Sequence, residues 1–113
     1  MHELGVVIEV VKTVERIVLE QNLTDVEKIV LQIGEVSSMI PKYIYSCYPA
    51  AVDGTFLEQT KLEIEVLPAN AICKECNKVF NFRENKGVCP KCEGIKLDML
   101  SGKEFMIKEI VAC

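Results

Sequence analysis

Four cysteines set in two pairs are the strongest chemical signal in this 113-residue sequence. The first pair is Cys73 and Cys76, and the second, after a spacer of twelve residues, is Cys89 and Cys92. Two residues between the sulfurs of a pair allow a tight loop to point both thiolates at one tetrahedral ion, and the spacer is long enough for a hairpin. Four thiolates leave no position for water or substrate. The pattern therefore predicts a structural zinc site.

The residues around the cysteine pairs suit small metal-binding loops. Asn77 and Gly94 lie just past the two pairs, where such loops often need a positive φ. Val79, Phe80 and Phe82 are expected to pack beside the metal. Two other uses of the four thiols stay open. They are redox disulfides, which need an oxidising compartment, and an iron centre of the rubredoxin kind.

The N-terminal segment Met1-His2-Glu3 is a second candidate for metal binding. The bulk of His2 should protect Met1 from removal, so the free amine of Met1, the amides of His2 and Glu3 and the imidazole lie in one chelating stretch. Such nitrogens surround a metal in a plane once the amide protons are lost, which suits Ni(II) or Cu(II) and is poor for Zn(II). The alternative is a disordered terminal histidine without a role.

Catalytic chemistry has little support in the sequence. His2 is the only histidine, so a cysteine nucleophile has no evident base. Cys47 is expected to be a small buried side chain of a helix, and Cys113 a frayed terminal residue. No Gly-rich phosphate loop and no serine-based triad can be assembled either.

Two amphipathic helices are expected to position these groups. One runs from Leu4 to about Gln21, because its apolar residues fall on one face at helical spacing and its charged residues opposite. The second begins at Pro41 and runs to about Val52, since proline costs nothing at the first helical position. Ser37 or Ser38 is expected to cap it, and Pro49 to kink or shorten it.

Three alternating stretches predict strands. The first ends at Gly34 and points Ile29, Leu31 and Ile33 to a buried side, with a mostly polar opposite side. The second, Lys61–Val66, alternates charged and apolar residues without a break, and the third is Glu104–Val111. The sequence thus predicts an α+β fold with a small three-stranded sheet and two helices, carrying an inserted zinc-ribbon-like domain with four cysteines.

The charge distribution supports an insert. Residues 73–94 hold five basic and three acidic residues, and the rest of the chain holds eight basic and fourteen acidic ones. We therefore expect a main domain formed by residues 1–69 and 99–113, and an inserted metal-binding domain formed by residues 70–98.

The overall composition narrows the class of protein. Half of the residues are apolar and the formal net charge is -4, which argues against a non-specific binder of nucleic acid. The apolar N-terminal stretch is interrupted by Glu9, Lys12, Glu15 and Arg16, so neither a signal peptide nor a membrane span is expected. The chain is therefore expected to be soluble and cytoplasmic.

Several short motifs, in order and over essentially the whole chain, carry a family resemblance. They are Met1-His2-Glu3-Leu4, Ile33-Gly34-Glu35-Val36, Gly54-Thr55, Val66-Leu67-Pro68-Ala69, and Cys89-Pro90-Lys91-Cys92 followed by Ser101-Gly102. With these motifs the chain resembles the HypA/HybF family of nickel metallochaperones, which act in the maturation of [NiFe]-hydrogenase.

This resemblance implies delivery of a metal and no catalytic turnover. It implies that Met1, His2 and Glu3 bind Ni2+ as transient cargo, and that the four cysteines of the two pairs bind structural Zn2+. The implied partners are a nickel-handling GTPase and the hydrogenase large subunit. The resemblance implies neither a nucleic-acid partner nor a membrane. The implied oligomeric state is a monomer or a homodimer. Some members have a second histidine near the end of the zinc segment. Here Asp98 and Glu93 are the nearest oxygen donors.

Two functions of other classes stay open at this point. One is a zinc-ribbon adaptor or nucleic-acid-binding module with no nickel role, supported by the local positive charge of the insert and its two phenylalanines. The other is a thiol redox enzyme that uses one cysteine pair.

Overall fold

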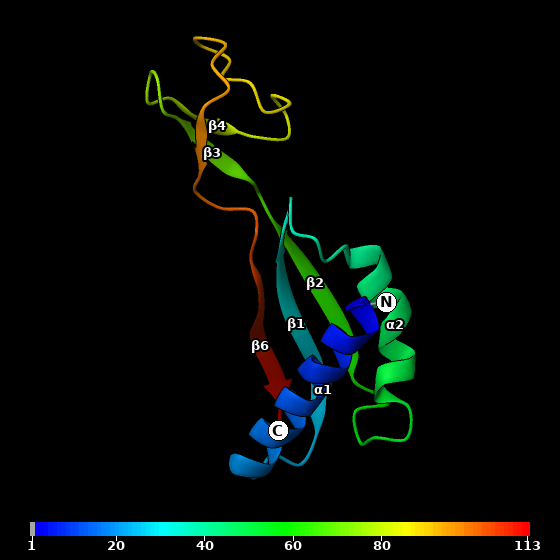
Figure 1. Ribbon diagram of the computed structural model, residues 1–113. Helices are drawn as coiled ribbons and strands as arrows, with labels where there is room; N and C mark the ends of the chain where they lie inside the picture. The colour runs from blue at the N-terminus through cyan, green and yellow to red at the C-terminus, as the bar shows by residue number, and fades with distance from the viewer. Residues whose placement is uncertain (1) are drawn as a thin grey trace.

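Two helices cover one face of a three-stranded sheet, and a second small sheet lies beyond the end of the first (Figure 1). The computed structural model describes residues 2–113. In chain order the elements are α1 (His2–Glu20), β1 (Val26–Gly34), α2 (Pro41–Val52), β2 (Lys61–Leu67), β3 (Asn70–Cys73), β4 (Val79–Asn81), β5 (Leu97–Met99) and β6 (Phe105–Ala112). The molecule is elongated, with extents of 54 × 28 × 16 Å. These elements confirm the predicted α+β class.

Helix α1 forms because its valines can be buried along one side. Val7, Val11, Val14 and Val18 lie on the predicted apolar face and are all buried, and Val10 widens that face. Valine has a modest helix propensity, so this helix depends on its packing against α2 and the sheet. Within residues 2–113, neither helix combines the length and the apolar character needed to cross a bilayer.

Helix α2 begins at Pro41 and ends at Val52 as predicted, but the predicted cap is wrong. Its N-cap residue is Ile40, and no side chain caps the helix. The hydroxyl of Ser37 instead accepts a hydrogen bond from the N–H of Met39 at 3.1 Å. Pro49 neither ends nor shortens the helix, which continues to Val52. Burial of the C-terminal half of α2 against the sheet accounts for this, because tertiary packing outweighs one lost backbone hydrogen bond.

The large sheet has β1 at its centre, parallel to β2 and antiparallel to β6. Ile29, Leu31 and Ile33 are almost completely buried under the helices, as predicted. The opposite face differs from the expected polar surface at Val30, which is also fully buried. Ion pairs cover this side of the sheet. They are Lys28 Nζ to Glu63 Oε1 at 3.6 Å and Lys108 Nζ to Glu65 Oε2 at 2.9 Å.

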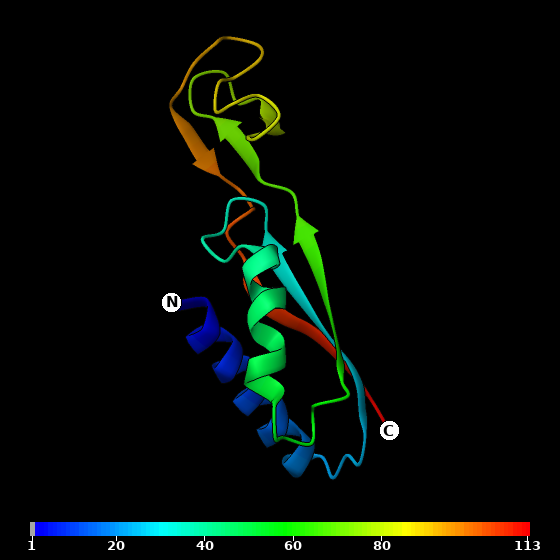
Figure 2. The same ribbon diagram turned by 90° about the vertical axis from the view of Figure 1, so that its right-hand side faces the viewer.

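The two sheets are joined by two segments that both pass the end of β1 (Figure 2). Residues 68–69 lead from β2 to β3, and residues 100–104 lead from β5 back to β6. Here the N–H of Val36 donates to the carbonyl of Gly102 at 2.9 Å. A Cβ on Gly34 would lie only 2.0 Å from the carbonyl carbon of Gly102. Gly34 is therefore required for the close contact of the two backbones, which we call the joint.

Gly34→Ala tests this contact. The added methyl group must push the returning segment away from β1, so we expect the free energy of unfolding to fall by about 1–3 kcal/mol. Gly5→Ala is the matched control, because a Cβ there meets nothing within 4 Å and alanine favours the helix. The control should be neutral or stabilising. Urea unfolding followed by circular dichroism measures both variants, and equal stability of the two would contradict a tight joint.

Candidate metal centre

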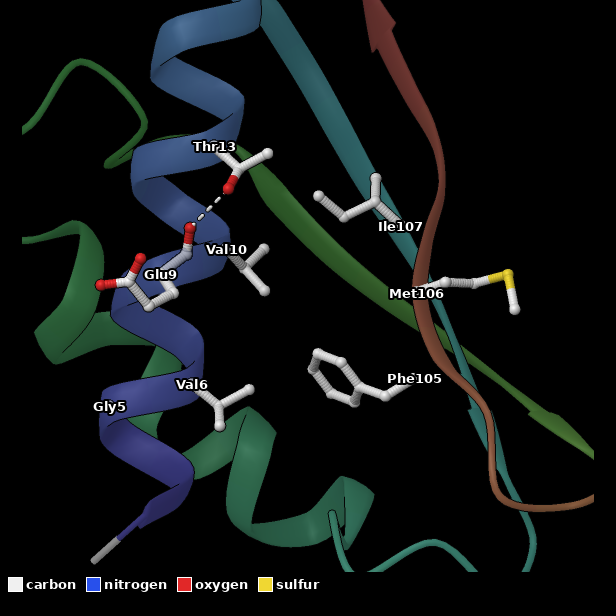
Figure 3. Close-up of a pocket in the computed structure, with 8 residues that line it drawn as sticks. All are labelled: Gly5, Val6, Glu9, Val10, Thr13, Phe105, Met106 and Ile107. Carbon is white, nitrogen blue, oxygen red and sulfur yellow. Dashed lines mark hydrogen bonds between the residues drawn. The ribbon is translucent and has the colours of Figure 1, made fainter.

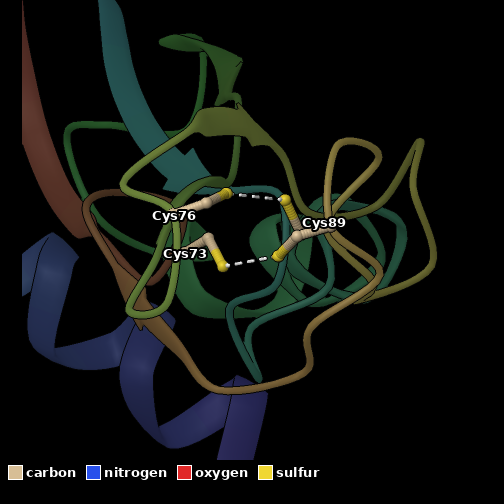
Figure 4. A group of neighbouring side chains, drawn as sticks. Cys73, Cys76 and Cys89 are labelled. Atoms are coloured by element: carbon tan, nitrogen blue, oxygen red, sulfur yellow. Dashed lines mark hydrogen bonds between the residues drawn. The ribbon is translucent and has the colours of Figure 1, made fainter.

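The four predicted cysteine ligands come together in the small sheet and its loops. All four Sγ atoms lie within 4.8 Å of one another. Cys73 Sγ and Cys92 Sγ are 3.5 Å apart, as are Cys76 Sγ and Cys89 Sγ, so each contact joins one pair to the other (Figure 4). Within the described residues 2–113, this is the one group of three or more His, Cys, Asp or Glu side chains that is arranged to hold a metal ion.

The spacing of the sulfurs fits a metal site and does not fit disulfides. A disulfide needs sulfurs about 2.05 Å apart, and all six cysteines are free thiols. Four thiolates around zinc at about 2.3 Å form a tetrahedron with edges of about 3.8 Å. The sulfurs need only small shifts to reach this arrangement. The donor set therefore suits zinc or iron and, with four donors, offers no open position.

Each cysteine pair lies in a loop closed by a backbone hydrogen bond of the same kind. In the first loop the N–H of Asn77 donates to the carbonyl of Cys73, and in the second the N–H of Glu93 donates to that of Cys89, both at 2.9 Å. Asn77 has the predicted positive φ, 62°. In the second loop the prediction for Gly94 is wrong, because Glu93 has the positive φ, also 62°.

Gly94 is needed for space instead. A Cβ there would lie 2.4 Å from the carboxylate Oε2 of Glu75 and 3.2 Å from the Sγ of Cys92. The N–H of Glu75 donates to the Sγ of Cys73 at 3.4 Å. The two loops thus pack directly on each other around the sulfurs.

The apolar support of the cluster is small. Cys73 and Cys89 are fully buried together with Ala71 and Phe80, and Phe82 is partly buried beside them. Val79 was also expected to pack near the metal, but it is 53% exposed. Alternation along β4 explains the difference, since Phe80 points inward and its neighbours point the other way.

The thiols of Cys89 and Cys92 differ in acidity. Desolvation raises the pKa of Cys89, but the backbone N–H groups of Cys92 and Lys91 and the thiols of Cys76 and Cys92 outweigh it and lower this pKa to about 7. The backbone N–H of Gly94 lowers the pKa of Cys92, whereas the other three thiols and desolvation raise it to about 12. The thiol of Cys89 therefore loses its proton at a lower pH than the thiol of Cys92. Metal binding displaces the remaining protons, so it weakens as the pH falls.

The second predicted site is Met1, His2 and Glu3. Met1 and the side chain of His2 lie outside the described part of the chain. Glu3 is buried in the first turn of α1. The start of α1 lies on the helix side of the large sheet, apart from the small sheet (Figures 1 and 2). Asp98, one of the two nearest oxygen donors in the sequence, forms an ion pair with Lys74 at 3.3 Å.

Glu35 is a structural residue whose role sequence reasoning missed. Its Oε2 accepts hydrogen bonds from the N–H of Ala69 at 2.8 Å and from Nδ2 of Asn81 at 3.3 Å. It therefore ties the end of β1 to the segment entering the small sheet and to β4. These two hydrogen bonds lower the pKa of the Glu35 carboxyl below its usual value, and the positive charge of Arg83 adds a smaller effect in the same direction. Together they outweigh desolvation, which raises this pKa. The only sequence signal is its place in the motif Ile33-Gly34-Glu35-Val36.

Comparison with known proteins gives a consistent family assignment. Residues 1–112 match the family model described as "Hydrogenase/urease nickel incorporation, metallochaperone, hypA". The chain is 30% identical over 110 residues to the hydrogenase maturation factor HypA of Chlorobium limicola, covering 97% of this chain and 95% of the relative. It is 34% identical over 110 residues to that of Trichormus variabilis, covering 97% and 94%.

Two solved structures share the fold. The solution structure of the Ni metallochaperone HypA from Helicobacter pylori has a TM-score of 0.66 at 23% identity, over 97% of this chain and 96% of that one. A second solution structure of a HypA protein has a TM-score of 0.73 at 24% identity, over 100% and 97%. These likenesses confirm the arrangement of two helices and small sheets.

Cys89→Ser tests the role of the cluster. Loss of one of four ligands should abolish tight metal binding and disorder residues 70–99, because apolar burial alone cannot hold that segment. We expect amide signals of the small sheet to collapse in a two-dimensional NMR spectrum, while those of β1 and β2 persist. Cys113→Ser, which changes an exposed thiol, should keep both the metal and the spectrum. An unaltered small sheet in metal-free Cys89→Ser would contradict this role.

Acidification should weaken the tie made by Glu35. A carboxyl group whose pKa is lowered in the folded state stabilises the fold above its unfolded pKa, about 4.3, and this contribution is lost as the pH falls through the folded pKa. We expect Glu35→Gln to be less stable than the unmodified chain at neutral pH, with the gap closing in acid. Urea unfolding at a series of pH values measures it, with Glu84→Gln as the exposed control. A gap that does not depend on pH would contradict the assignment.

Proposed function

Because this chain belongs to the HypA family of nickel metallochaperones, which act in hydrogenase maturation, we propose that it binds Ni2+ through Met1, His2 and Glu3 and delivers it to the large subunit of a [NiFe]-hydrogenase. The main structural support is the closed cluster of four thiols. Its four donors fill one coordination sphere and offer no position from which a cargo ion could be passed on. A metal that has to be released therefore needs a second, open site.

We propose that the cluster holds structural Zn2+. When bound there, zinc cross-links the two loops and so replaces the large apolar core that the small sheet lacks. On this basis the chain divides by function into residues 1–69 with 99–113, which carry nickel, and residues 70–98, which carry zinc. The joint at Gly34 and Glu35 holds the two parts in a defined orientation.

The chemistry of the N-terminal segment supports nickel as the cargo. The amine of Met1, the amides of His2 and Glu3 and the imidazole of His2 supply nitrogen donors at adjacent positions, a set that suits planar Ni(II) and is poor for Zn(II). The carboxylate of Glu3 offers an oxygen donor if the coordination number is higher. This difference in donor type keeps the two metals apart, since soft thiolates bind zinc and nitrogen donors bind nickel.

Transfer of nickel requires partners and a shared compartment. We propose that a nickel-handling GTPase and the hydrogenase large subunit receive the ion in the cytoplasm, without catalytic turnover by this chain. Loss of nickel on transfer would return protons to the amide and imidazole nitrogens. The negative net charge favours capture of a free cation and disfavours nucleic acid as a partner.

A nickel titration of the zinc-loaded protein with its native N-terminus tests the proposal. We expect calorimetry to show one Ni2+ site per chain that is lost in His2→Ala and in a chain with an added N-terminal residue, because both remove donors of the segment. Asp98→Ala, which removes a carboxylate of the small sheet, is the control and should retain the site. Zinc content and the circular dichroism spectrum should be the same in all four proteins. Nickel binding unchanged by both N-terminal changes would place the cargo site elsewhere.

A further inference from the structure

The helix layer covers β2 along only part of its length. Leu62 and Ile64 point to the helix side and pack against the main core. Val66 points to the same side two residues further on, beside the start of α2 (Figure 2), and it is 56% exposed. Ile40, the residue before α2, is 47% exposed. Two large apolar side chains are thus left uncovered where the helix layer ends.

A cleft of about 410 Å³ lies at this place. Its walls are the end of β1, the segment that leads into α2, and Val66 at the end of β2. Arg83, which follows β4, lines it from the small sheet. The cleft is therefore formed by both parts of the molecule. We call it the joint cleft, because Gly34 and Glu35 of the joint also line it.

The edge of β2 offers backbone groups at the joint cleft. Leu67 faces β1, since its carbonyl accepts from the N–H of Glu35 at 2.8 Å. Ile64 faces away from β1, since its N–H donates to the hydroxyl of Tyr45 at 2.9 Å. Alternation along the strand then turns the N–H and C=O of Val66 outward, and within residues 2–113 β2 pairs with β1 alone. An extended chain can bond both groups.

The charged groups at the joint cleft favour an anionic ligand. Arg83 is exposed and has no ion-pair partner within residues 2–113. Lys42 is exposed in the first turn of α2, where the helix dipole is positive. Glu35 is acidic, but its Oε2 already accepts hydrogen bonds from Ala69 and Asn81. The local charge is therefore positive, in a chain whose net charge is -4.

The larger groove between α1 and β6 lacks this combination of groups. It has a volume of about 560 Å³, and Val10 of α1 faces Ile107 of β6 across it (Figure 3). No basic residue is among the described residues that line it. The hydroxyl of Thr13 donates to the carbonyl of Glu9 within α1 at 2.8 Å. The groove thus presents apolar surface without a group that selects a ligand.

We propose that the joint cleft binds an extended, acidic segment of a protein partner. The backbone of the segment bonds the N–H and C=O of Val66, one apolar side chain packs on Ile40 and Val66, and one carboxylate pairs with Arg83. Nucleic acid fits less well, because the apolar side chains and the open strand edge have no use in binding a phosphate backbone. The segment would touch both parts of the molecule, so its binding would hold them in one orientation. This site does not use the N-terminal segment that we propose for nickel.

A peptide titration of the zinc-loaded full chain, followed by two-dimensional NMR, tests the proposal. The probe is an acetylated and amidated heptapeptide in which glutamate and valine alternate. We expect saturable shifts of the amide signals of Ile40, Val66 and Arg83. Arg83→Gln should weaken binding about fivefold, because the ion pair is lost. Lys78→Gln removes an exposed cation of the small sheet that does not line the cleft, and it should bind the peptide unchanged.

A second peptide separates the charge from the apolar contact. With glutamine in place of glutamate, the peptide should bind the unmodified chain about fivefold more weakly and should not distinguish it from Arg83→Gln. Ile40→Asp should weaken the binding of both peptides, because it places a carboxylate at the apolar contact. This variant should still fold, since aspartate is a favourable residue at the N-cap of α2.

Several results would overturn the proposal. They are an absence of saturable shifts at every peptide concentration, equal binding of the two peptides, and a loss in Lys78→Gln as large as that in Arg83→Gln. Tighter binding of a single-stranded DNA octamer to the same residues would assign the cleft to nucleic acid instead. Circular dichroism and zinc content check that each variant is folded. Arg83→Gln should still bind one nickel ion per chain, so a failure of this proposal is distinct from a failure of the nickel site.

Discussion

The close contact of the Gly34 and Gly102 backbones determines how the two parts of the molecule are connected. The chain leaves the large sheet after β2 and returns to it as β6, so both connections have to pass the end of β1. Hydrogen bonds from Val36 to Gly102 and from Gly34 to Glu104 fasten the returning segment, and Glu35 fastens the outgoing one at Ala69. The absence of a side chain at Gly34 lets both connections lie within hydrogen-bonding distance of the same strand end. The orientation of the metal cluster relative to the helices depends on this joint.

The two parts of the molecule are stabilised by different means. Within residues 2–113, the helices and the large sheet bury thirteen apolar residues in one cluster. The small sheet buries four residues, two of which are cysteines. On the function proposed above, its stability comes from metal binding, and the close packing of the two cysteine loops at Gly94 is a condition for bringing the sulfurs together. The same four donors that give the small sheet its stability also make it unsuitable for a cargo that has to leave.

The sequence predicted those features that depend on local order or fixed spacing. The alternation of Ile29, Leu31 and Ile33 identifies the buried side of β1, and the spacing of the cysteine pairs identifies the cluster. Features that depend on distant partners were not predictable. Val30 on the opposite side of β1 is also buried, and the ion pair of Lys108 in β6 with Glu65 in β2 joins residues far apart in the sequence. In the second cysteine loop the positive φ falls on Glu93, and Gly94 is needed one residue later because of its tight contact with Glu75.

The bulge at Lys108 determines on which side of the large sheet the charged residues of β6 lie. The bulge sets both Lys108 and Glu109 on the open side of the sheet, where Lys108 donates to both carboxylate oxygens of Glu65 at 2.9 and 3.0 Å. These bonds lower the pKa of the Glu65 carboxyl and raise the pKa of the Lys108 ammonium group, so the pair stays charged. A regular strand of the same length would alternate strictly and would set one of the two residues among the apolar side chains under α1. The bulge thus keeps charge out of the core.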